Sequence, residues 1–141
     1  MARFGRRSMS LLEGIHPLLV DWALRVVTIY DCSVVSGVRD LTTQAQYVAT
    51  GASRTMKSKH LIQTDSYGHA IDLAPYPIDW DRLRSFDVLG GVGIAIAHEM
   101  GIPITWGGDW DRDTDVYDQD FNDLGHFQIE VSYIPHNGIV L

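Results

Sequence analysis

Apolar residues along this 141-residue chain fall into short segments of two kinds, those with helical spacing and those that alternate with polar residues. Helical spacing is clear after Pro17, whereas alternation is clear in segments 69–73 and 127–133. Glycine and proline separate the segments. This pattern predicts an α+β fold, in which helices flank a small, mostly antiparallel sheet. The length suits one domain that covers residues 1–141.

Capping and breaking residues give approximate bounds for each element. Ser8 is expected to cap a helix over 9–13, Thr42 or Thr43 a helix to residue 48, and Asp79 a helix to residue 84. A longer helix then runs to about residue 98, and Gly101 ends it. The expected strands are 34–35, 69–73, 102–106 and 127–133. We expect Trp22 and Cys32 in the core, and His16 and His136 at the surface.

The net charge of −7 is concentrated in one segment. Residues 109–123 contain seven aspartates and one arginine. A basic face for nucleic acid is therefore not expected. The apolar run 88–97 contains three glycines and is too short to cross a bilayer, so we expect no stable membrane association.

Two further features bear on location and on metal chemistry. The N-terminal arginines are followed by no uninterrupted apolar stretch, so we expect no secretory signal and a cytoplasmic protein. Cys32 is the only cysteine, which excludes an intramolecular disulfide and a thiolate metal cluster. Any metal must therefore be bound mainly by imidazole and carboxylate groups.

Three short stretches could provide such ligands. His60 lies in a polar loop, Asp72 on a strand between the small residues Ala70 and Ala74, and His126 at the start of another strand. Two imidazoles and one carboxylate from separate elements would leave one position of a tetrahedral zinc site open for water. Asp123, three residues before His126, could act as a base toward that water. Arg39 could stabilise the negative charge that develops on an attacked amide.

The acidic segment suggests a second cation. Asp109, Asp111, Asp113 and Asp115 occupy alternate positions, as ligands do in a calcium loop. Thr114 stands where an EF-hand requires glycine, so the segment is not an EF-hand. A cation would nevertheless relieve the repulsion between its carboxylates, and Ca²⁺ binding is a hypothesis. A solvated loop without a cation is the alternative.

Ser58-Lys59-His60 followed by Gly68-His69-Ala70-Ile71-Asp72 resembles the zinc signature of the DD-peptidase (D-alanyl-D-alanine carboxypeptidase-like) superfamily. Similarity extends to Gly37-Val38-Arg39, to Trp106-Gly107-Gly108-Asp109-Trp110 and to Asp123-Leu124-Gly125-His126-Phe127. The whole set is most similar to phage endolysins that act as L-alanyl-D-glutamate peptidases. It covers nearly the whole chain.

This resemblance implies a hedgehog-like α+β fold and a zinc-dependent endopeptidase that cuts the stem peptide of peptidoglycan. His60, Asp72 and His126 match the Zn²⁺ ligands, and Ser58 matches a serine that lines the substrate cleft. Asp123 matches the catalytic acid/base, and Arg39 the arginine that stabilises the transition state. Five residues more than usual separate His60 from Asp72. His69 is therefore an alternative ligand, although the offset of Ser58 favours His60.

The resemblance also implies a biological setting. We expect a monomeric catalytic domain without a separate wall-binding module, held in the host cytoplasm until a holin gives it access to periplasmic peptidoglycan. A D,D-carboxypeptidase or dipeptidase of the same superfamily is one alternative. An inactive, metal-stabilised wall-binding module is another. Asp123, a carboxylate outside the proposed ligand set, favours the enzyme.

Overall fold

The computed structural model describes residues 1–131 and contains helices and strands in mixed order. The helices are α1 (Arg6–Leu11), α2 (Pro17–Ile29), α3 (Leu41–Ala49) and α4 (Leu83–Met100). The strands are β1 (Cys32–Ser36), β2 (Ala70–Pro75), β3 (Ile104–Trp106) and β4 (His126–Ile129). The α+β prediction is confirmed.

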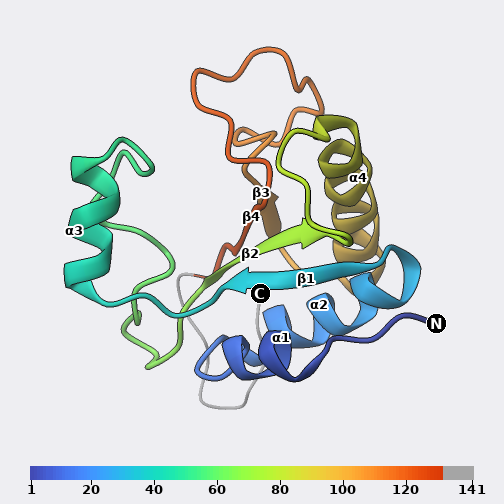
Figure 1. Cartoon of the computed structure of the whole chain (residues 1–141), viewed down its shortest axis with the longest axis horizontal. Helices are drawn as coiled ribbons and strands as arrows, with labels where there is room; N and C mark the ends of the chain where they lie inside the picture. Colours follow the sequence, from blue (N-terminus) through green and yellow to red (C-terminus); the bar gives the residue numbers. More distant parts are fainter. Residues whose placement is uncertain (132–141) are drawn as a thin grey trace.

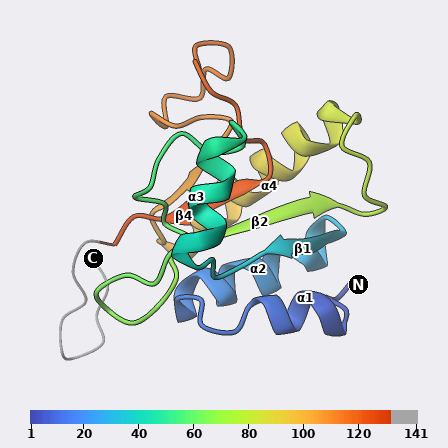
Figure 2. The ribbon, with the colours of Figure 1, turned by 60° about the vertical axis from the view of Figure 1, so that its left-hand side comes forward.

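The strands form one sheet in the order β1-β2-β4-β3, and every neighbouring pair is antiparallel. Figures 1 and 2 show α1 and α2 beside β1 and the loop after β3 at the opposite end of the molecule. Helix α3 is set apart from the sheet, beyond the end of β1 (Figure 1). The long, irregular connection after α3 leads to β2.

Helices α2 and α4 pack together and cover the core side of the sheet. Trp22 of α2 lies against Phe127 of β4, with ring centroids 4.9 Å apart, and its indole N–H donates to the carbonyl of Gly93 on α4. A Cβ atom at Gly93 would come within 2.8 Å of the Trp22 ring, and one at Gly90 within 2.4 Å of Trp106. The glycines that interrupt the apolar run therefore let large aromatic side chains approach the α4 backbone.

Three predicted caps are wrong, for different reasons. Ser8 lies inside α1, and its hydroxyl accepts the Val34 N–H of β1 at 3.0 Å. Asp40, and not Thr42 or Thr43, caps α3 by accepting the Thr43 N–H at 2.7 Å. Asp79 accepts the N–H of Asp81 in a turn, and α4 begins only at Leu83. Ser8 is thus used by a distant strand, an earlier residue caps α3, and Asp79 forms a local turn that competes with helix capping.

Other expectations are confirmed or corrected by burial. Trp22 and Cys32 are in the core, and Gly101 ends α4 with a φ of 69°. His16 is buried and not at the surface, because its backbone N–H donates to Gly68 and its ring packs against Tyr67 and His69. His136 and the end of the predicted strand 127–133 lie outside the described residues. Within residues 1–131, no helix is long and apolar enough to cross a membrane.

Candidate metal centre

Antiparallel pairing places the first two candidate ligands opposite each other. Asp72 of β2 is the register partner of His126 of β4. Residues 71 and 73 are buried in the core, so Asp72 projects from the other face of the sheet. Its neighbour on that face, Ala70, is small and leaves space beside the carboxylate. The geometry of the sheet therefore positions a carboxylate and an imidazole side by side.

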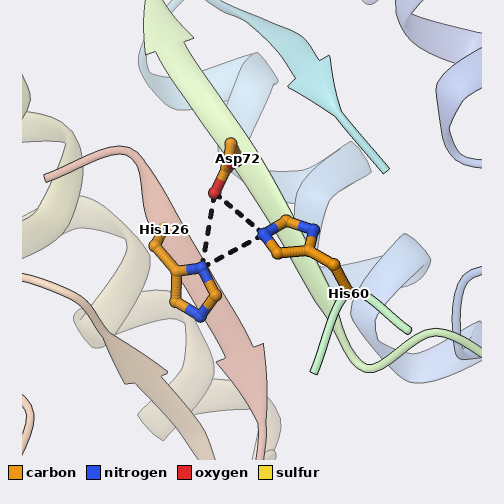
Figure 3. Close-up of side chains that lie close together, drawn as sticks. All are labelled: His60, Asp72 and His126. Carbon is orange, nitrogen blue, oxygen red and sulfur yellow. Dashed lines mark hydrogen bonds and ion pairs between the residues drawn. The ribbon is translucent and has the colours of Figure 1, made fainter. Parts of the chain in front are cut away.

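His60 completes the cluster from the long connection (Figure 3). Two backbone hydrogen bonds hold its loop: the Arg39 N–H donates to the His60 carbonyl at 2.9 Å, and the His69 N–H donates to the Lys59 carbonyl at 2.8 Å. The extra residues between His60 and Gly68 are thus accommodated in a loop that is fixed at both ends. His69 is not part of the cluster, because its Nε2 pairs with Asp65 at 2.6 Å.

Three ligand atoms converge at nearly equal separations. His60 Nε2 lies 3.2 Å from Asp72 Oδ1 and 3.2 Å from His126 Nδ1, and the last two atoms are 3.4 Å apart. A tetrahedral ion with bonds of about 2.0–2.1 Å requires its ligand atoms to be about 3.3–3.4 Å apart. The separations therefore match those that a tetrahedral metal site demands.

Each ring is oriented so that a bare nitrogen faces the cluster. His60 Nδ1 lies 2.9 Å from the Gly37 carbonyl, which only accepts hydrogen bonds, so Nδ1 carries the proton. His126 Nε2 lies 2.8 Å from Oε1 of Gln128 and donates to it in the same way. The lone pairs of His60 Nε2 and His126 Nδ1 then point toward the Asp72 carboxylate. Three acceptors that face one another in a buried site require a cation or a proton between them.

Within the cluster, the negative form of Asp72 and the positive form of His126 stabilise each other. Burial opposes ionisation of Asp72, yet its pKa is held well below the usual range because His60 and His126 stabilise the carboxylate. Burial likewise opposes protonation of His126, but hydrogen bonding and attraction to Asp72 raise its pKa above the ordinary value. A site that favours a carboxylate and attracts positive charge is suited to a metal cation.

Asp123 stands beside the cluster without being part of it. Its Oδ2 lies 3.9 Å from His126 Nδ1, and its side chain is 39% exposed. Burial, followed by the negative charge of Asp72, raises the pKa of Asp123 above the ordinary value. A carboxylate with a raised pKa next to a metal site can both accept and return a proton.

Arg39 also approaches the cluster. One guanidinium nitrogen lies 3.5 Å from Asp72 Oδ2 and 3.2 Å from the Ser36 hydroxyl, and another donates to Gln44 at 2.8 Å. The guanidinium also lies over the Tyr47 ring at 4.4 Å. Gln44 is fully buried and binds the segment 53–55, so Arg39 is held in place by an element that is itself anchored.

A cavity of about 450 Å³ opens over the cluster. Ser58 lies in its wall, where its hydroxyl accepts the His60 N–H at 3.1 Å. The cationic residues of the wall are Arg39, Arg54, Lys57 and Lys59. The cavity can therefore accept an anionic ligand beside the metal centre.

Sequence reasoning missed one residue that orients the site. Gln128 binds His126 and lies two residues further along β4, on the same face. Residues two apart on a strand share a face, so the spacing of Gln128 from His126 could have predicted this contact. Trp110 packs against His126 with ring centroids 5.2 Å apart and lines the cavity, whereas Trp106 is buried and donates to the Leu124 carbonyl.

The acidic segment contains a second group of carboxylates. Asp109, Asp111 and Asp113 lie close enough together to hold one ion. Asp109 is buried and accepts the N–H groups of Asp113 and Thr114. Asp115 is not in this group, and its carboxylate accepts the Tyr117 N–H. Calcium binding here stays a prediction.

Comparison with known proteins gives a consistent result. The family described as phage L-alanyl-D-glutamate peptidase matches residues 1–130. The L-alanyl-D-glutamate peptidase of Escherichia phage T5 is 34% identical over an alignment of 125 residues, and the match covers 83% of this chain and 88% of the phage protein. The crystal structure of the Serratia marcescens L-Ala D-Glu endopeptidase ChiX aligns with a TM-score of 0.72 and 30% identity, over 90% of this chain and 89% of that one.

Proposed function

We propose that this chain, which belongs to the phage L-alanyl-D-glutamate peptidase family, is a peptidoglycan endopeptidase that cleaves the L-alanyl–D-glutamate bond of the stem peptide. The convergence of the His60, Asp72 and His126 lone pairs on one point carries this proposal. That arrangement has little structural use without a cation, and it lies at the base of a cavity.

The donor set favours zinc. Two neutral imidazoles and one carboxylate are typical of catalytic zinc sites, which keep one position open. Zinc bound by His60, Asp72 and His126 would lower the pKa of a water molecule to about 7 and polarise the scissile carbonyl.

Asp123 and Arg39 supply the remaining chemistry. Asp123 takes a proton from the attacking water and returns it to the amine of D-glutamate as the amide bond breaks. Arg39 stabilises the negative charge that develops on the carbonyl oxygen of L-alanine. The raised pKa of Asp123 and the anchored position of Arg39 support these roles. The cationic wall with Ser58 would receive the carboxylates of the stem peptide beyond the scissile bond.

Digestion of purified peptidoglycan tests the assignment. Mass spectrometry should find peptides that begin with D-glutamate after incubation with the protein, and no such peptides in the presence of a chelator. Release of D-alanine would instead indicate the D,D-carboxypeptidase alternative.

The variant Asp123→Asn separates an enzyme from an inactive binding module. We expect it to retain the metal but to lose activity by about 10²–10⁴-fold. An unchanged rate of cleavage would overturn the proposed role of Asp123, and no cleavage by the unaltered protein would support the inactive module.

We also propose that the protein is a monomer that remains in the host cytoplasm until a holin opens the inner membrane. Membership of a phage family supports the proposed location and release, and sedimentation tests the monomer. Expression with and without a holin, followed by optical density, tests it. Lysis without the holin would contradict the proposed dependence.

A further inference from the structure

A second cavity, of about 550 Å³, adjoins the first at Asp123, which lines both. It is formed by the start of α4, the segment that precedes this helix, and the loop between β3 and β4. Trp80, Phe86 and Tyr117 are its aromatic residues. We call this cavity the Trp80 groove.

The Trp80 ring forms an accessible flat surface in the groove. Trp80 stacks on Phe86 with ring centroids 5.5 Å apart and an interplanar angle of 22°. Trp80 is nevertheless 58% exposed, and Tyr117 is 95% exposed. Phe86, in contrast, is buried and supports the Trp80 ring from below. Trp80, held against Phe86 with its other face open to solvent, is suited to bind the apolar face of a ligand, and the exposed Tyr117 lines the same groove.

The two cavities meet at Asp123, which lines both. Their chemistry differs: the first has four cationic side chains in its wall, whereas the charged side chains of the Trp80 groove are the carboxylates of Asp87 and Asp123. A ligand that spans Asp123 would therefore have an anionic part on one side and a neutral part with apolar faces on the other.

The proposed substrate has this asymmetry, and the inference rests on the proposed function. Beyond the scissile bond lie D-glutamate, with its α-carboxylate, and the rest of the stem peptide. Before the bond lie L-alanine and the lactyl group that attaches it to a neutral N-acetylated sugar. These two units span only about 7 Å when extended. The sugar must therefore contact the protein close to Asp123, on the other side of the scissile bond from D-glutamate.

We propose that the Trp80 groove binds the N-acetylmuramoyl sugar of the glycan strand, with Trp80 and Tyr117 packed against the sugar ring. Contacts made by this remote part of the substrate help to place the scissile bond at the catalytic residues. The groove thereby gives the enzyme a preference for stem peptides that are still attached to glycan over free peptides.

A matched pair of substrates tests this proposal. One is the stem tetrapeptide with an acetylated amino end, and the other is the same peptide attached to the N-acetylglucosaminyl–N-acetylmuramoyl disaccharide. We expect the unaltered protein to have the higher kcat/KM on the saccharide substrate. Trp80→Ala and Tyr117→Ala should each lower the ratio of the two kcat/KM values about tenfold. Trp80→Phe, which keeps a flat ring, should retain most of the ratio.

The control is Tyr76→Ala, since Tyr76 is 64% exposed and precedes the same helix but does not line the groove. For this variant, the ratio of the kcat/KM values on the two substrates should equal that of the unaltered protein. Equal ratios in the unaltered protein and Trp80→Ala would overturn the proposal. So would a dimer, detected by sedimentation, that Trp80→Ala dissociates, because the groove would then bind a second copy of the chain.

A binding measurement separates this proposal from the proposed function. The disaccharide alone is titrated into metal-loaded protein while the indole N–H signal of Trp80, assigned by its loss in Trp80→Phe, is followed by NMR. A shift of this signal supports the groove even if neither substrate is cleaved, in which case only the assigned reaction fails. Cleavage of both substrates without a preference, and without a shift, overturns the groove alone.

Discussion

Each histidine of the metal centre is oriented by the ring nitrogen that faces away from the cluster. For His60 the partner is the Gly37 carbonyl, which follows directly from β1. For His126 it is the Gln128 side chain, which in turn donates to Glu130 at 2.6 Å. Such outer partners determine which tautomer is present, so they influence metal affinity without touching the ion.

Gln128→Leu should therefore weaken metal binding while the ligands remain in place. Leucine has a similar size but cannot accept the His126 proton, so the tautomer with a bare Nδ1 is no longer favoured. We expect the dissociation constant for zinc to rise about 10–100-fold. Competition with a chromophoric chelator measures this change. Gln46→Leu, at an exposed position of α3, is the control, and equal affinities of the two variants would contradict the role of Gln128.

At the scale of the elements, α4 shows how packing overrides helix propensity. Gly91 and Gly93 both lie inside the helix, where alanine is intrinsically preferred by about 1 kcal/mol. A Cβ at Gly91 would meet no atom within 4 Å, whereas one at Gly93 would contact the rings of Trp22 and Phe127 at 2.8 and 2.9 Å. The two sites differ in tertiary surroundings and not in local conformation.

Alanine substitutions at these two glycines should have opposite effects. Gly91→Ala should increase the free energy of unfolding by about 0.5–1 kcal/mol. Gly93→Ala should lower it by about 1–3 kcal/mol, because the aromatic core must shift. Urea denaturation of the metal-loaded proteins measures both. Two changes of the same sign would contradict the packing described for α4.

The N-terminus of α2 should make stability depend on pH. His16 Nδ1 accepts the Leu18 N–H at 3.1 Å, which requires that nitrogen to be unprotonated. Burial, and then the nearby His69, lower the pKa of His16 below 6.5. The folded protein therefore binds fewer protons than the unfolded chain. The contribution of His16 is complete above about pH 6.5 and is lost as the pH falls below that value.

His16→Asn tests this dependence, because asparagine can cap the helix and does not titrate. Between pH 7.5 and pH 5, the Tm of the unaltered protein should fall more than that of the variant. Differential scanning calorimetry of both metal-loaded proteins gives the comparison. Parallel decreases in Tm would show that His16 is not responsible.

The loop between β3 and β4 connects the acidic group to the metal centre. Trp110 follows Asp109, packs against His126, and donates its indole N–H to the Phe121 carbonyl at 2.7 Å. If Ca²⁺ binds Asp109, Asp111 and Asp113, it should stabilise this loop. We expect calcium, at concentrations well above its dissociation constant, to raise the Tm of the zinc-loaded protein by about a few degrees, because it binds the folded state. Asp111→Asn should abolish the shift and Asp81→Asn, at an exposed position outside this loop, should not. No shift in the unaltered protein would end the hypothesis.

The candidate metal centre joins parts of the chain that are far apart in sequence. His60 belongs to the long connection, Asp72 to the middle of the sheet, and His126 to the strand that follows the acidic loop. An ion bound by all three would hold the connection and the loop against the sheet. Binding to the folded state alone stabilises it by mass action.

Removal of the metal should therefore lower stability as well as activity. We expect a chelator to lower the Tm by about 10 °C, and zinc to restore it. His126→Ala should show a low Tm that neither chelator nor zinc changes. An unaltered protein whose Tm is insensitive to the chelator would indicate that the three residues do not bind a metal.

Local sequence patterns were sufficient to predict the fold class, the end of α4 at Gly101, and the imidazole and carboxylate groups of the candidate metal centre. Those features depend on backbone preferences and on spacing within a few residues. The resemblance, through the offset between Ser58 and His60, also favoured His60, which the structure places in the cluster despite the lengthened loop. His69, the alternative ligand, pairs with Asp65 and lies outside the cluster.

Long-range contacts determined the rest. Ser8 looked like a cap but binds β1, and His16 looked exposed but is buried under Tyr67 and His69. The directions of the His60 and His126 lone pairs depend on hydrogen bonds to Gly37 and Gln128. The junction of the two cavities at Asp123 depends on how the loop after β3 returns to the sheet. Spacing along a chain specifies which groups are available. Which atoms face one another depends on strand pairing and loop closure between residues far apart in sequence.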